Sequence, residues 1–315
     1  MSRPIIPDNI ALSRRDLLKA GIAAGASAFL PCGGALAETG PLIQRKIPSS
    51  GESLPVIGIG TARRYEDIQT EAQKAPLRET LRQFKELSGK LIDTSPTYGT
   101  AEAVVGELTS ELKIRNDLFI ATKVSIQGRD AGIRQMEDSF KKLRTDKIDL
   151  IAVHNLRDTE AHFRTLRDWK QAGRIRYLGI TTSFPRQYGD FERTMKAGPL
   201  DFIQVDYALD NREAGKTILP LAAERGMAVM INLPFGRGRL FNAVKGQKLP
   251  PWASEFDCAS WAQFFLKYIV SHPAVTCCMP GTAKVEYVLD NLGAARGRLP
   301  DAAMRRRMET FLEAG

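Results

Sequence analysis

The sequence predicts an α/β protein in which eight parallel strands, each followed by a helix, close into a single (β/α)8 TIM barrel. Short apolar runs alternate eight times with amphipathic stretches of helical period. No G-x-G-x-x-G sequence follows the first run, and the eight units leave no second domain, so closure is favoured over a doubly wound sheet. A length of 315 residues suits one such barrel or two ordinary domains.

The expected strands are the short apolar runs, and the expected helices are the amphipathic stretches between them. The strands are expected at residues 56–60, 91–93, 118–122, 150–153, 177–181, 202–206, 228–232 and 275–279. The helices are expected at residues 75–88, 101–112, 132–143, 159–172, 186–197, 213–225, 260–271 and 284–295.

Three segments stand outside this alternation. Residues 43–55, with Ser49-Ser50-Gly51-Glu52 as a turn, predict a β-hairpin that plugs the bottom of the barrel. Residues 299–313 predict a last surface helix. Residues 233–254 form the one long irregular stretch, and loops of that length usually serve as lids or binding loops.

The first 37 residues have the pattern of a cleaved export signal. Ser13-Arg14-Arg15-Asp16-Leu17-Leu18-Lys19 resembles the twin-arginine motif, a mildly apolar stretch follows, and Ala35-Leu36-Ala37 suits signal peptidase. We therefore expect a signal peptide at 1–37 and one barrel domain at 38–315. The twin-arginine translocase and signal peptidase would be partners during export, and the periplasm the location. An uncleaved membrane anchor is the alternative, although the apolar run is short for a span.

The charge pattern argues against a nucleic-acid partner. The formal net charge is +9, but Lys and Arg are scattered along the chain. The densest cluster, Arg305-Arg306-Arg307, lies in the predicted C-terminal helix, and we interpret it as a solvated face. A hydrophobic content of 43% is typical of a globular domain.

Cysteine and histidine usage argues against a disulfide framework and a metal site. Three cysteines follow the signal, and an odd number does not suit paired disulfides. Cys277 and Cys278 are adjacent in an apolar run, where strand geometry directs them to opposite faces, so we expect both to be buried as small apolar residues. The chain has three histidines and no carboxylates clustered at ligand spacing, so no metal is expected.

Four residues at or near the ends of expected strands predict the site. Asp93, Lys123 and His154 each follow an apolar run, and Tyr98 lies in the loop after Asp93. In a barrel of this kind, functional groups gather at the carboxyl ends of the strands, so these four are expected to meet.

Their residue types indicate a proton-donating site for carbonyl reduction. Hydride addition to a carbonyl makes an alkoxide, and a tyrosine can supply the proton that it needs. A nearby ammonium lowers the pKa of a phenol. We therefore predict Tyr98 as general acid, Lys123 and Asp93 as the pair that tunes it, and a neutral His154 as the group that orients the carbonyl.

The motifs around these residues resemble those of the aldo-keto reductase superfamily, and they do so in the family's order over nearly all of the chain after the signal. The motifs are Gly58-Ile59-Gly60-Thr61, Asp93-Thr94-Ser95-Pro96-Thr97-Tyr98-Gly99, Thr122-Lys123, the strand ending in His154, Gly179-Ile180-Thr181, Gln204-Val205-Asp206-Tyr207, and Pro280-Gly281-Thr282 followed by Asn291.

The resemblance implies an extended NADP(H), or NAD(H), across the mouth of the barrel and a small aldehyde or ketone as substrate. Thr181 and Gln204 would meet the nicotinamide carboxamide, and Lys284 is the natural partner for a 2′-phosphate. The full set that it implies for the cofactor is Thr61, Thr181, Thr182, Gln204, Asn232, Pro234, Gly236, Gly238, Gly281, Thr282, Lys284 and Asn291.

Three positions depart from the family's pattern. Thr181-Thr182 stands where many members have Ser-Asn, Asn232 where an aromatic residue often stacks on the nicotinamide, and Tyr287 where an Arg is frequent. Because the departures fall in the cofactor set, NADP versus NAD stays open. A silent scaffold protein of this fold in the periplasm, and a redox partner of membrane electron transport, are the alternatives. The substrate and the oligomeric state are not predicted.

Overall fold

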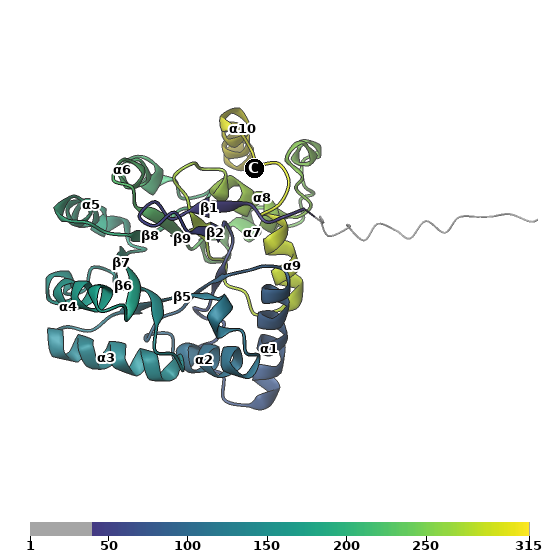
Figure 1. Ribbon diagram of the computed structural model, residues 1–315. Coiled ribbons are helices and arrows are strands. Elements are labelled where there is room, and N and C mark those ends of the chain that lie inside the picture. The colour runs from purple at the N-terminus through teal and green to yellow at the C-terminus, as the bar shows by residue number, and fades with distance from the viewer. Residues whose placement is uncertain (1–39, 315) are drawn as a thin grey trace, which may run out of the picture. The chain divides into compact units, whose positions relative to one another are not determined.

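The computed structural model describes residues 40–314, and the predicted signal peptide lies outside them. Within the described part, a two-stranded hairpin precedes a barrel of strands and helices (Figure 1). No helix in residues 40–314 is both long and apolar enough to cross a membrane.

The eight barrel strands are parallel and follow one another in chain order around the sheet. The first and last edges also meet, since Ile57 bridges Cys278 and Gly60 bridges Gly281, both in parallel. The sheet is therefore closed, and the predicted (β/α)8 barrel is confirmed. The strands are β3 (Ile59–Gly60), β4 (Leu91–Asp93), β5 (Phe119–Val124), β6 (Ile148–His154), β7 (Ile175–Thr181), β8 (Phe202–Asp206), β9 (Ala228–Asn232) and β10 (Cys277–Cys278).

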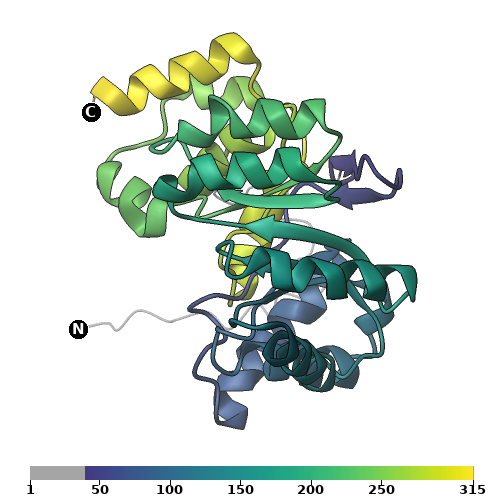
Figure 2. The same ribbon diagram turned by 90° about the vertical axis from the view of Figure 1, so that its left-hand side faces the viewer.

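Helices lie between successive strands and surround the sheet (Figures 1 and 2). The first one begins earlier than expected because Thr70 and Gln73 form a capping box that starts it at Glu71. The helices around the barrel are α1 (Glu71–Glu86), α2 (Ala101–Glu111), α3 (Arg129–Lys142), α4 (Thr159–Gln171), α5 (Tyr188–Ala197), α6 (Ile218–Glu224), α8 (Trp261–Val270) and α9 (Val285–Gly293).

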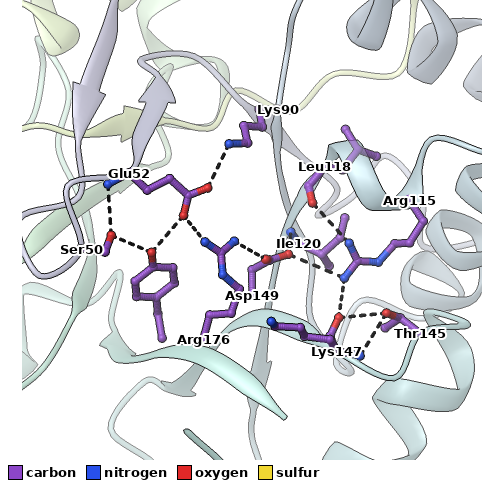
Figure 3. A network of polar contacts seen from close by, with 11 residues as sticks. Ser50, Glu52, Lys90, Arg115, Leu118, Ile120, Thr145, Lys147, Asp149 and Arg176 are labelled. Atoms are coloured by element: carbon purple, nitrogen blue, oxygen red, sulfur yellow. Dashed lines mark hydrogen bonds and ion pairs between the residues drawn. The ribbon is translucent and has the colours of Figure 1, made fainter. Parts of the chain in front are cut away.

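The hairpin covers the amino-terminal end of the barrel, as predicted. Its strands β1 (Gln44–Lys46) and β2 (Ser53–Pro55) pair antiparallel, and Ile47 and Leu54 pack into the cluster of side chains inside the barrel. Glu52 holds the turn in place: it accepts from Lys90 and Tyr177 and pairs with Arg176, all at the starts of strands (Figure 3).

The barrel has two apolar layers, and the cysteines show the division. Cys277 belongs to the cluster inside the barrel, with Phe119 and Tyr177, whereas Cys278 belongs to the larger cluster between the sheet and the helices. Adjacent strand residues point to opposite faces, so this placement is the one expected. Cys277 and Cys278 are buried, as predicted, and Cys258 is buried as well.

The long stretch after β9 is more regular than the sequence indicated. It holds a 3-10 turn at Gly236–Gly238, helix α7 (Arg239–Ala243) and a second 3-10 segment at Pro251–Phe256. The chain ends in the predicted last helix, α10 (Ala302–Ala314). Arg305 on this helix donates to Tyr207 and Ser271, so the basic cluster Arg305–Arg307 is not simply a solvated face.

Candidate active site

The structure brings the four predicted catalytic residues together at the carboxyl end of the barrel. Asp93 ends β4, Lys123 lies one residue before the end of β5, and His154 ends β6. These three strands are parallel neighbours in the sheet. Tyr98 follows on the loop after β4 and packs against the core.

Lys123 and Asp93 form a buried ion pair. The Lys123 ammonium lies 2.8 Å from Asp93 Oδ1 and also donates to the Thr94 carbonyl at 2.7 Å. Burial lowers the pKa of Lys123, but the charge of Asp93 acts in the opposite direction, and the pKa of Lys123 ends above its ordinary value. The lysine is therefore a fixed positive charge at neutral pH.

Tyr98 lies over that charge. The Lys123 ammonium is 5.4 Å from the centre of the Tyr98 ring, and the phenol lines a cavity. Burial raises the pKa of Tyr98, and the charge of Lys123 lowers it, as the sequence suggested; burial is the stronger of the two, so the phenol stays protonated. The group is thus in the form that a proton donor requires.

His154 faces Tyr98 as a neutral imidazole. The two rings lie nearly perpendicular, with centres 6.1 Å apart. Burial, with a contribution from the charge of Lys123, lowers the pKa of His154 to about 3. The Ser95 hydroxyl lies 3.4 Å from Nδ1, and a hydroxyl donating there leaves Nε2 with its proton. A neutral N–H donor beside the phenol suits a carbonyl oxygen.

A cavity of about 450 Å³ opens above these residues. It joins the catalytic group to the ends of β7, β8 and β9 and to the loop after β9. Its walls are formed by Gly60, Ala62, Arg63, Arg64, Glu66, Asp93, Tyr98, His154, Asn155, Thr181, Ser183, Phe184, Gln204, Asn232, Leu233, Pro234, Phe235, Arg237, Gly238, Phe241, Met279 and Gly281.

A larger depression of about 600 Å³ lies elsewhere, over the loop after β8, α7 and α10. Its charged side chains are paired with one another, Asp210 with Arg239 and Arg212 with Glu313. None of the four predicted catalytic residues lines it. Size alone therefore does not identify the site, and three of the four predicted catalytic residues, Asp93, Tyr98 and His154, line the smaller cavity.

Six of the twelve residues predicted for the cofactor line the smaller cavity: Thr181, Gln204, Asn232, Pro234, Gly238 and Gly281. Two of them present unused polar atoms. Gln204 Nε2 and Asn232 Oδ1 are buried and have no hydrogen-bond partner in the described part of the chain. Burying an unpaired polar atom is costly, so such atoms are often completed by a ligand. A donor and an acceptor on neighbouring strands fit a carboxamide.

Four of the remaining six support the walls from behind. Asn291 Nδ2 donates to Thr282 Oγ1 at 3.1 Å, and Thr61 Oγ1 donates to the Asp93 carbonyl at 3.1 Å. Thr182 Oγ1 lies 2.6 Å from Gln187 Oε1. These three hydroxyls are buried and already bonded.

The last two predicted cofactor residues lie outside the cavity wall. Gly236 is buried with a positive φ of 55°, and it shapes the turn that places its neighbours. Lys284 is exposed at the start of α9, 3.5 Å from Glu286.

Sequence reasoning missed several residues of the cavity. Arg63, Arg64 and Arg237 line it, and each lies within three residues of a residue predicted for the cofactor, Thr61 or Gly238, which is the signal that could have found them. Phe184 and Phe241 line it too. Trp252 and Phe256, from the long stretch after β9, do not line it and pack on Phe264 of α8.

No metal centre is found among residues 40–314: no group of three or more His, Cys, Asp or Glu side chains could hold an ion there. His162 is used structurally, with Nε2 2.7 Å from the Ile126 carbonyl oxygen.

A family model described as "Aldo/keto reductase family" matches residues 56–310. Among curated proteins, the chain is 30% identical over 276 residues to methylglyoxal reductase YeaE of Escherichia coli (strain K12), an alignment that covers 83% of this chain and 93% of YeaE. It is also 30% identical over 177 residues to aldo-keto reductase YhdN of Bacillus subtilis (strain 168), covering 51% of this chain and only 53% of YhdN.

Solved structures of the same kind resemble the fold. An aldo/keto reductase from Klebsiella pneumoniae, solved in complex with NADP and acetate, gives a TM-score of 0.70 at 23% identity, over 83% of this chain and 93% of that one. The glycerol dehydrogenase AKR11B4 from Gluconobacter oxydans gives 0.70 at 23% identity, over 86% and 95%. At these identities the likeness bears on the fold alone.

Proposed function

The chain belongs to the aldo/keto reductase family, and on that premise we propose that it is an NADP(H)-dependent reductase that converts aldehyde or ketone carbonyls to alcohols. The observation that carries the proposal is the buried Lys123–Asp93 ion pair beneath Tyr98, with His154 beside it in an open cavity. A fixed ammonium, a protonated phenol and a neutral imidazole are together what carbonyl reduction needs of a protein.

The bound cofactor would supply a hydride to the carbonyl carbon. His154 and Tyr98 would both donate hydrogen bonds to the carbonyl oxygen and hold it in one position. As negative charge develops on that oxygen, Tyr98 would give up its proton, and the Lys123 ammonium would stabilise the phenolate that remains. Asp93 would keep Lys123 charged and in place, since a lone buried ammonium tends to lose its proton.

The cavity wall supports a nicotinamide cofactor. Gln204 Nε2 would donate a hydrogen bond to the carboxamide of the nicotinamide, and Asn232 Oδ1 would accept one from it. Gly238 and Pro234 would let the diphosphate lie close to the backbone after β9, and Lys284, exposed at the start of α9, would reach a 2′-phosphate and so favour NADP over NAD.

The proposed location is the periplasm, reached by the twin-arginine pathway. The support is the motif at residues 13–19 and the small-x-small sequence at 35–37. That pathway carries folded proteins, so the cofactor could be loaded in the cytosol before export.

A binding titration joined to a turnover assay tests this function. The full chain is titrated with NADPH and NADH by cofactor fluorescence, and Tyr98→Phe is compared in a carbonyl-reduction assay. We expect tighter binding of NADPH than of NADH, with turnover that Tyr98→Phe removes while binding is kept. If neither nucleotide binds, the cofactor proposal fails and the silent scaffold becomes the better explanation.

A further inference from the structure

Three exposed arginine residues line the 450 Å³ cavity, and their side chains have no partner in residues 40–314. For the guanidinium groups of Arg63, Arg64 and Arg237, no hydrogen bond, ion pair or ring contact is found within residues 40–314. Arg239, two residues after Arg237, is different: it pairs with Asp210 at 3.0 Å and does not line this cavity. We call Arg63, Arg64 and Arg237 the arginine rim.

The charge of the cavity is positive by simple counting. Among its lining residues the arginine rim contributes three positive charges, and Glu66 and Asp93 contribute two negative ones. Lys123 is counted as well, with one positive charge, because its ammonium pairs with Asp93. The sum is 3 + 1 − 2 = +2. One oxygen of Glu66 is already used by the backbone N–H of Arg63, at 2.7 Å. A cavity of one sign attracts small ligands of the other.

The arginine rim lines the same cavity as Tyr98 and His154. Burial is the main cause of the raised pKa of Tyr98, but Arg237 also acts on the phenol and lowers its pKa. Arg64 lies beside Gly281, with its Nε within 3.4 Å of the Cβ position of that glycine. Arg237 therefore shares the cavity with Tyr98 and acts on its phenol, whereas Arg64 lies beside a residue predicted for the cofactor.

The backbone holds two of these arginines in an unusual conformation. Arg63 has φ of 60° and Arg237 has φ of 57°, in the left-handed region that non-glycine residues rarely adopt. Residues persist there when the surrounding structure requires it, and such positions cluster at ligand sites. Both arginines line the cavity.

Resting on the proposed reductase function, we propose that the preferred substrate is an anionic carbonyl compound, of which an oxo acid is the simplest, and that Arg237 and Arg63 bind its anionic group. A guanidinium can bind a carboxylate through two parallel hydrogen bonds, which gives direction as well as attraction. The arginine pair would thereby orient the carbonyl toward Tyr98 and His154.

Two aldehydes of equal chain length test the proposal. With saturating NADPH, kcat/KM of the full chain is measured for 4-oxobutanoate and for butanal. We expect the acid to be preferred by about tenfold or more, mainly through a lower KM, and the preference to shrink as salt is raised because exposed charges are screened. Equal kcat/KM for the two aldehydes would overturn the proposal.

Variants locate the preference. Arg237→Gln and Arg63→Gln should each reduce the ratio of the two kcat/KM values about tenfold. Arg186→Gln is the matched control: it removes one charge near the same opening, from a guanidinium that lies over Phe184 and does not line the cavity, and the ratio should stay as in the wild type. If the rim variants weaken NADPH binding and leave the ratio alone, the arginines bind cofactor phosphates and the proposal is wrong.

A binding measurement separates this proposal from the reductase function itself. Butanoate and butanamide are titrated calorimetrically into the full chain with NADP⁺. Binding of butanoate but not butanamide, lost in Arg237→Gln, supports the anion site even if no aldehyde is turned over, an outcome that would count against the reductase function only. Absence of butanoate binding overturns the anion site.

Discussion

Lys123 and Asp93 come from neighbouring parallel strands, and their side chains meet at 2.8 Å in a place almost closed to water. Either charge alone would destabilise the fold, because burying an unpaired charge costs free energy. Together they put a permanent ammonium beneath Tyr98, and this relationship determines most of what the site can do.

The first prediction concerns this ion pair: removing both charges should restore stability but not activity. Asp93→Asn should destabilise the protein by about 3 kcal/mol, because it leaves the Lys123 ammonium buried without its counter-charge. Lys123→Met in the Asp93→Asn background should recover much of that stability. Both proteins should lose roughly 10²–10⁴-fold in kcat, since the charge that assists the proton transfer is gone or misplaced.

Urea unfolding and steady-state kinetics on the two single variants and the double variant measure both quantities. Lys123→Arg is the control, since it keeps a charge in the pair but changes its shape. Full activity in the double variant would contradict the assigned role of the ion pair.

The second prediction concerns pH. The pKa of His154 falls to about 3 in the folded protein, so the neutral imidazole should persist across pH 5–8 and kcat/KM should show no step there from this group. The unfolded chain takes up this proton near pH 6.5. Between about pH 6.5 and 3 the unfolded state therefore binds more protons, and the free energy of unfolding should fall as the pH falls.

His154→Asn should reduce the slope of the free energy of unfolding against pH. The reduction is at most the contribution of one bound proton, roughly 1.4 kcal/mol per pH unit. His272, whose pKa burial lowers to about 4, is a useful comparison because it lies away from the cavity lining. His272→Asn should flatten the slope without affecting turnover. A bell-shaped rate profile with an inflection at pH 6–7 that disappears in His154→Asn would show that the imidazole is charged during catalysis.

The third prediction uses the unpaired donor of Gln204. Gln204→Leu removes a buried amide whose Nε2 has no partner in residues 40–314, so the free protein should be no less stable than the wild type. The affinity for NADPH should nevertheless fall about tenfold, because the bond to the carboxamide is lost. Thermal unfolding with and without NADPH, together with fluorescence titration, gives both values. An unchanged affinity would remove Gln204 from the cofactor site.

The positions of the four residues proposed for catalysis were predictable because strand ends are a local property of sequence. Asp93, Lys123 and His154 each follow an apolar run, and parallel strands in a closed barrel bring their carboxyl ends to one face. The same logic gave the division of Cys277 and Cys278 between two apolar layers. No knowledge of packing was needed for either.

The arginine rim was not predictable in the same way. Whether Arg63 and Arg237 reach the cavity depends on a left-handed φ in a loop, and periodicity says nothing about that angle. Arg305 was misjudged for a related reason: a charge pattern does not tell which face of α10 docks, and the structure turns Arg305 toward Tyr207. The helix α7 inside the long loop is too short for a periodic signal.

The fourth prediction compares two glycines that both lie in helices. A helical Gly→Ala change ordinarily stabilises, by up to about 1 kcal/mol, because alanine loses less backbone freedom on folding. Gly189→Ala in α5 should follow this rule by a few tenths of a kcal/mol or more, since nothing but the end of Arg193 comes within 4 Å of the added Cβ.

Gly106→Ala in α2 should do the opposite. Its Cβ would lie 2.0 Å from the Lys142 carbonyl oxygen and 2.7 Å from the backbone of Leu143, so α2 and α3 would have to separate. Overpacking of this kind costs about 1–3 kcal/mol, which exceeds the gain in helix propensity. Both variants are compared by urea unfolding. Because α2 also carries Glu102, which accepts from Thr122 next to Lys123, Gly106→Ala should lower kcat as well, whereas Gly189→Ala should not. Equal stabilisation by the two changes would mean that α2 and α3 are not in close backbone contact.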